Sequence, residues 1–143
     1  MNTNNLIELR KNLKLTQAQM AKIVNVKSNT YSDYETSKII IPLEKLNTIS
    51  NKFDVSLDYL AGITKNKDED FKHIEIDNNI ISKNLQKIRL ENNYTQEYIA
   101  SKLNTADSTI SDYELGKSKI TILILIEYHE LFKVSIDKLC GKK

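Results

Sequence analysis

The tetrapeptide Ser-Asp-Tyr-Glu stands at residues 32–35 and recurs, 79 residues later, at residues 111–114. The same register relates residues 5–62 to residues 84–141 without an insertion or deletion, and about a third of the paired positions are identical. Solenoid repeats are about 20 to 50 residues long. A period of 79 residues therefore predicts two small domains in tandem, each with its own core.

Composition narrows the fold class. Charged residues make up 28% of the 143 residues and apolar residues 40%, which is typical of folded domains rather than disordered chains. Only three glycines and one proline are present, and hairpin turns need more of both. We therefore expect an all-α fold. The net charge of +2 permits nucleic-acid binding but does not require it.

The repeat also sets the expected domain boundaries. We predict a first domain at residues 1–62, a linker at 63–78 and a second domain at 79–143. The first half of the linker is charged. In its second half apolar residues alternate with polar ones, which fits either a short extended segment or a tether packed on a domain.

Each copy carries signals for five short helices. In the first copy, Thr16 and Gln19 form a capping box at the start of a second helix. Asn25 follows that helix and suits a left-handed turn residue. A third helix is expected from about Ser28 to Glu35, with its tyrosines facing inward.

The second and third helices of each copy, with a tight turn between them, make a helix-turn-helix. Ala21 and Ala100 lie where the two helices should cross, because a small side chain permits a close approach. Asn25 and Asn104 occupy the turn position that needs a positive φ. This arrangement leaves the polar side of the third helix available for the major groove of DNA.

Thr-Gln at residues 16–17 and 95–96, followed by an alanine, by Ser-x-Tyr-Glu and by a late Val-Ser-x-Asp-x-Leu, resembles the XRE (Cro/repressor-type) helix-turn-helix family. The resemblance covers nearly all of each copy. It implies an all-α chain of two tandem five-helix, lambda-repressor-like domains joined by a linker. It also implies that the third helix reads double-stranded DNA, usually as a homodimer on a two-fold-related operator.

The resemblance places a DNA-binding site on each copy. In the first copy it implies contacts from Gln17, Lys27, Ser28, Asn29, Thr30, Ser32, Asp33 and Lys38. In the second copy it implies contacts from Gln96, Asp107, Ser108, Thr109, Ser111, Asp112, Lys117 and Lys119. Asparagine can bond adenine with two hydrogen bonds. In the second copy Ala106 replaces Lys27 and Asp107 replaces Ser28, so we expect the first copy to be the stronger reader.

An arginine and a glutamate that recur in both copies have a structural interpretation. Arg10 with Glu35, and Arg89 with Glu114, resemble the family's internal ion pair that ties the first helix to the third. We favour that role over a contact with DNA.

The two copies differ most in the fourth helix. There Leu123, Ile124 and Ile126 replace three residues expected on the surface, Glu44, Lys45 and Asn47. A helix that is apolar all round needs a second partner that covers it. Three explanations stay open: a rearrangement toward strand, packing against the first copy or its connector, and a homodimer interface.

The function favoured by these features is a sequence-specific transcriptional regulator, most simply a repressor. We expect no cofactor, no metal and no small-molecule ligand. The alternative is a protein-interaction module, antitoxin-like or anti-repressor, on the same scaffold. An enzyme is disfavoured, because neither a carboxylate pair nor a nucleophile with its base stands out. Without a signal peptide or a long apolar run, we expect a cytoplasmic protein.

Overall fold

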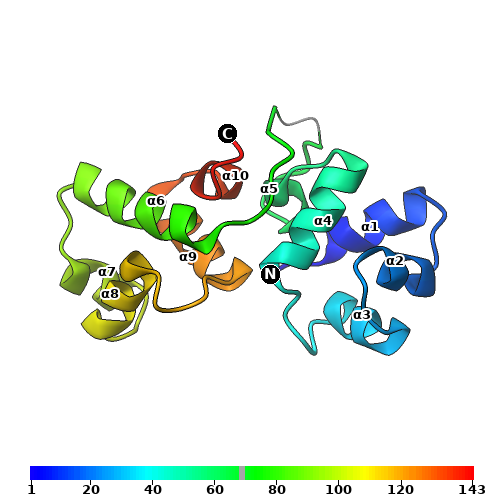
Figure 1. Cartoon of the computed structure of the whole chain (residues 1–143), viewed down its shortest axis with the longest axis horizontal. Coiled ribbons are helices and arrows are strands. Elements are labelled where there is room, and N and C mark those ends of the chain that lie inside the picture. Colours follow the sequence, from blue (N-terminus) through cyan, green and yellow to red (C-terminus); the bar gives the residue numbers. More distant parts are fainter. Residues whose placement is uncertain (68–69) are drawn as a thin grey trace. The chain divides into compact units, whose positions relative to one another are not determined.

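The computed structural model describes residues 1–67 and 70–143 and divides into two compact units, Met1–Glu75 and Ile76–Lys143 (Figure 1). All regular structure in those residues is helical, which confirms the all-α prediction. The predicted linker contains residues 68 and 69, which lie outside the described residues. None of the described helices is long and apolar enough to cross a membrane.

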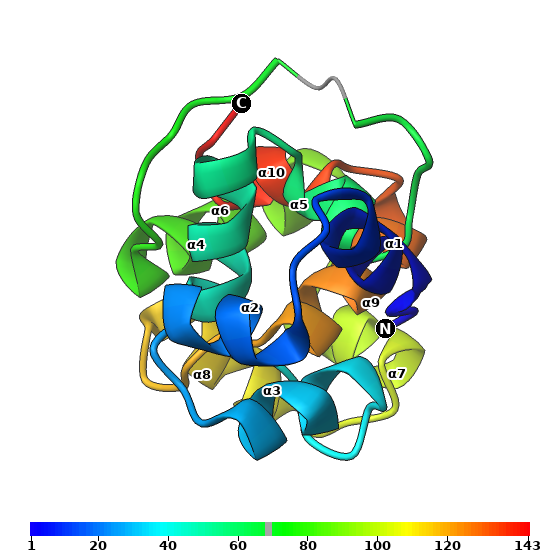
Figure 2. The ribbon, with the colours of Figure 1, turned by 90° about the vertical axis from the view of Figure 1, so that its right-hand side faces the viewer.

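Five helices form the first unit, and Figure 2 presents α2 and α3 at its front. They are α1 (Asn4–Asn12), α2 (Gln17–Ile23), α3 (Ser28–Glu35), α4 (Leu43–Phe53) and α5 (Leu57–Leu60). Each helix sends a fully buried apolar side chain into the core; these are Leu6, Met20, Tyr31, Leu46 and Leu57.

The second unit repeats this order. Its helices are α6 (Asn78–Glu91), α7 (Gln96–Lys102), α8 (Asp107–Leu115), α9 (Ile122–Phe132) and α10 (Ile136–Leu139). The buried residues at the corresponding register positions are Leu85, Ile99, Ile110, Leu125 and Ile136. Both units therefore fold around the same five-residue pattern, with aliphatic residues replacing Met20 and Tyr31.

The helix-turn-helix geometry rests on local signals. The Thr16 hydroxyl accepts from the Gln19 backbone N–H, and the Gln19 side chain accepts from the Thr16 N–H, so the capping box is complete. Asn25 and Asn104 have φ of 59° and 53°, as the turn requires. Ala21 is 2% exposed where α2 packs against α3. The predicted turn and the predicted close approach are both present.

Replacing the turn asparagines tests this account. Asn25→Ala places an ordinary Cβ residue in the left-handed region, which costs about 1 kcal/mol, whereas Asn25→Gly should be close to neutral. Urea unfolding of the two variants measures the difference. Asn104→Ala and Asn104→Gly give the matched pair in the second unit, and an alanine variant as stable as its glycine counterpart would contradict the turn assignment.

The fourth helix corrects one expectation and removes one alternative. The segment Ile122–Phe132 is a regular α-helix, so a rearrangement toward strand is wrong. Asn47, expected on the surface, is only 4% exposed. Its side chain binds the connector, a partner that inspection of the helix alone did not reveal. Cys140 is buried, as its correspondence with Ala61 suggests.

Candidate nucleic-acid interface

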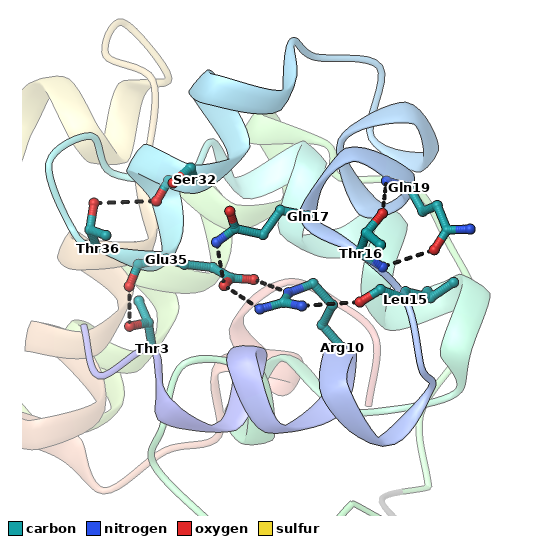
Figure 3. Close-up of polar contacts among 9 residues, drawn as sticks. All are labelled: Thr3, Arg10, Leu15, Thr16, Gln17, Gln19, Ser32, Glu35 and Thr36. Atoms are coloured by element: carbon teal, nitrogen blue, oxygen red, sulfur yellow. Dashed lines mark hydrogen bonds and ion pairs between the residues drawn. The ribbon is translucent and has the colours of Figure 1, made fainter.

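A buried ion pair holds the helix-turn-helix of the first unit against α1 (Figure 3). The Arg10 guanidinium donates from Nε to Glu35 Oε2 at 2.7 Å and from Nη2 to Oε1 at 3.0 Å. Its Nη1 donates to the Leu15 carbonyl at 3.0 Å, which fixes the turn between α1 and α2. Gln17 Nε2, at the start of α2, donates to Glu35 Oε1 at 3.0 Å. One carboxylate thus joins three helices. We call these contacts among Arg10, Gln17 and Glu35 the clamp.

The second unit contains an equivalent clamp. Arg89 Nε and Nη2 donate to Glu114 at 2.7 and 2.8 Å, and its Nη1 donates to the Tyr94 carbonyl at 2.9 Å. Gln96 Nε2 donates to Glu114 at 3.2 Å. The two ion pairs tie the first helix of each unit to its third helix, as predicted.

The charge state of the clamp is set by its contacts. Burial alone would raise the pKa of Glu35, but hydrogen bonds from Arg10 and Gln17, together with the Arg10 charge, hold that pKa below its usual value. The hydrogen bond to Glu35 likewise raises the pKa of Arg10, although burial opposes it. Both groups are therefore charged at neutral pH.

Breaking the clamp from one side should destabilise the first unit strongly. Arg10→Met leaves the Glu35 carboxylate buried without its cation, which costs about 3–5 kcal/mol. The double variant Arg10→Met, Glu35→Leu should lose less, because neither charge remains. Urea unfolding measures both, and Lys11→Met on the exposed side of α1 is the control.

The lowered pKa also gives the clamp a pH dependence. Its contribution is present above the unfolded pKa of Glu35, near 4.5, and is lost as the pH falls through the folded value. Glu35→Gln should therefore flatten the acid side of the stability curve.

The clamp holds the end of α3 against the rest of the domain, and the polar residues of this helix lie at the surface. Lys27, Ser28 and Asn29 are exposed, and Thr30, Ser32 and Asp33 are half-buried. Tyr31 and Tyr34 face the core. The structure therefore places the predicted reading residues on one accessible side of the helix, with exposed Lys38 following it.

The first turn of α3 has no side-chain cap at its N-cap residue. Within the described residues, α2 begins with a capping threonine, whereas the cap position of α3, Lys27, makes no side-chain hydrogen bond to the helix. The Asn29 carboxamide oxygen accepts from the Thr30 backbone N–H at 3.0 Å. Bidentate pairing with adenine uses the carboxamide oxygen and nitrogen together, and an amide oxygen has two lone pairs, so the contact with Thr30 leaves an acceptor site for a base.

The corresponding side of α8 has a different charge. Asp107 and Ser108 are exposed, Thr109, Ser111 and Asp112 are half-buried, and Ala106 stands at the cap without a polar side chain. Asp107 lies in the first turn, where an anion suits the helix dipole but opposes a phosphate. Lys117 and Lys119, beyond the helix, supply the nearby cations. The first turns of α3 and α8 therefore differ in charge at their exposed surfaces.

Gln17 and Gln96 combine an internal contact with a predicted contact to DNA. Both residues are half-buried at the start of their helices. Each uses its amide nitrogen on the clamp glutamate. That nitrogen carries a second hydrogen, so a phosphate contact remains compatible with the clamp.

Sequence reasoning missed exposed apolar residues next to α3 and α8. Ile39 and Ile40, between α3 and α4, are 46% and 39% exposed, and Leu115, at the end of α8, is 62% exposed. On α9, the three apolar residues that were predicted at surface positions are partly covered: Leu123 is 38% exposed, while Ile124 and Ile126 are half-buried. The run of three isoleucines at residues 39–41 was the available signal, since only Ile41 is buried.

These features define the class of protein: a tandem pair of helix-turn-helix domains. A family model described as helix-turn-helix matches the chain twice, at residues 6–60 and 85–139. The chain belongs to this family, in its XRE-type branch.

One curated relative comes from Bacillus subtilis (strain 168), where it is named the uncharacterized HTH-type transcriptional regulator YobD. It is 38% identical to this chain over 63 residues, which are 44% of this chain and 56% of that protein. The chain thus spans little more than half the length of this relative. No solved structure matches the chain.

Proposed function

We propose that the protein is a sequence-specific, double-stranded DNA-binding transcriptional regulator that represses by occupying its operator. The observation that carries the proposal is the exposed polar side of α3, held on a rigid base by the Arg10–Glu35 pair. The family assignment and the naming of the Bacillus subtilis relative as a transcriptional regulator support the same function.

The two domains contribute unequally in this proposal. Lys27, Ser28 and Asn29 give the first domain a cation and two adaptable hydrogen-bonding groups at the helix tip. Asp107 gives the second domain an anion at the place that corresponds to Ser28. The first domain therefore supplies most of the base reading, and the second adds weaker contacts through Ser108, Ser111 and the lysines beyond α8.

Substitutions in α3 should separate base reading from phosphate contact. After a binding site has been selected from random duplex DNA, Asn29→Ala should weaken that site by about 1–3 kcal/mol and relax its sequence preference. Lys38→Ala should instead weaken binding to all sequences and lower the salt slope by about 1. Titrations at several salt concentrations measure both effects.

The control for these variants is Lys52→Ala, which removes an exposed cation from α4. The double variant Ala106→Lys, Asp107→Ser should bind DNA more tightly, because it gives the first turn of α8 the residues that stand at Lys27 and Ser28 in the first domain. If no sequence is enriched and binding is flat across salt, the regulator proposal fails. The scaffold would then serve as a protein-interaction module, for which Asp107 is the favouring feature.

The α9 surface supports a proposal about assembly. Leu123, Ile124 and Ile126 keep apolar area exposed on a helix whose opposite side already fills the core. Burial of such area releases about 25 cal/mol per Å². We place a homodimer interface at these three residues, so that the second domain assembles the complex while the first domain reads DNA.

Exchanging the three residues for those of the first copy tests the interface. The variant Leu123→Glu, Ile124→Lys, Ile126→Asn should sediment as a monomer near 16.5 kDa, whereas the natural chain should sediment at twice that mass. Operator affinity should fall with the mass. Glu91→Gln, a change on the exposed surface of α6, is the control, and a monomeric natural chain would overturn the proposal.

A further inference from the structure

The connector after α5 is fastened to the first unit along α4 (Figure 2). The side-chain amides of Asn47 and Asn51 donate to the Ile74 carbonyl oxygen at 2.8 and 3.0 Å. One residue earlier, His73 Nε2 lies 2.8 Å from Asp54 Oδ1. The rings of His73 and Phe71 pack with centroids 5.3 Å apart. We call residues 71–75 the strap.

The strap lies against polar residues that are spaced along one side of α4. Asn47, Asn51 and Asp54 follow one another at spacings of four and three residues, so they share one side of α4 and its end. Asn47 is 4% exposed, and a buried carboxamide needs hydrogen-bond acceptors such as the Ile74 carbonyl. Both amides converge on that one oxygen, which fixes the strap at a defined residue.

The second copy lacks these groups. The positions that correspond to Asn47, Asn51 and Asp54 hold Ile126, Glu130 and Lys133. No carboxamide stands at any of the three, so the means of holding an extended segment is specific to the first copy.

The other end of the connector is fastened to the second unit. Asp77 caps α6 by accepting from the Asn79 backbone N–H at 2.9 Å. Asn78 donates to the Ser118 carbonyl at 3.1 Å and accepts from the Ile120 N–H at 2.8 Å. The chain between Ile74 and Asn78 therefore spans at most about 14 Å, whereas a connector free from Gly62 onward would reach about 55 Å.

We propose that the strap sets how far apart the two helix-turn-helix domains of one chain can bind along DNA. Asn47 and Asn51 then determine specificity for the separation of two binding boxes rather than for their base sequence. A short tether gives a high effective concentration at sites within its reach and almost none beyond it, while a long flexible tether serves many separations. The inference rests on the proposed function, since both domains must contact DNA.

Selection from a random duplex library tests the separation directly. The natural chain should enrich two boxes at one separation, with a tolerance of about one base pair. Asn47→Ala with Asn51→Ala should enrich the same boxes over several separations. Lys52→Ala, on the exposed side of α4, is the matched control and should keep the single separation.

A second variant guards against loss of folding at buried Asn47. Asn51→Ala with His73→Ala changes only partly exposed side chains and should broaden the separations as well, to a smaller degree. Helical circular dichroism confirms that each variant is folded. If folded variants enrich the same single separation as the natural chain, the strap does not set the reach.

A measurement without DNA separates this proposal from the proposed function. Dyes attached through Lys11→Cys and Lys87→Cys, in a Cys140→Ala background, report the distance between the domains by single-molecule energy transfer. The natural chain should give a narrow distribution, and the Asn47, Asn51 variant a distribution at least twice as wide. Unchanged widths overturn the strap, whether or not DNA is bound. Broadened widths with no enriched DNA overturn the function and, with it, the assigned role in spacing.

Discussion

The bidentate ion pair between Arg10 and Glu35 is the contact on which the position of α3 depends. Its carboxylate receives donors from α1 and from the first residue of α2, and it belongs to the last residue of α3. The same guanidinium holds the Leu15 carbonyl in the preceding turn. Because the charges are largely removed from water, their geometry is exacting, and α3 cannot shift against α1 without leaving a buried charge unpaired.

That rigidity explains why the copies can diverge on their surfaces. Arg89 and Glu114 repeat the clamp almost atom for atom, and the same five register positions fill both cores. Exposed residues outside this frame, such as Lys27, can change without disturbing it. Changes such as Lys27 to Ala106 alter what each unit presents to a partner while the scaffold stays the same.

Much of this was predictable from the sequence, for physical reasons that act locally. The capping box at Thr16, the left-handed asparagine at 25 and the helical spacing of the core each depend on a few neighbouring residues. The clamp was predicted only through the family resemblance, since its partners are 25 residues apart. Asn47 was misplaced on the surface, because its burial depends on Ile74, a contact that no local pattern encodes. The DNA-reading residues stay predictions, because they come from the family resemblance rather than from a contact within the chain.

The hydrogen bonds from Asn47 and Asn51 to the Ile74 carbonyl oxygen also make the order of the two copies important. A duplication first produces halves that could be exchanged, since either can fold on its own pattern of buried residues. Asn47 and Asn51 bind a segment that follows α5, so the first half is completed by residues that lie after the repeated region and have no counterpart in the second copy. A gene rearranged to place residues 76–143 ahead of residues 1–62 would encode two intact cores, yet its joint would hold neither half. The two copies can therefore no longer be exchanged in their order along the chain.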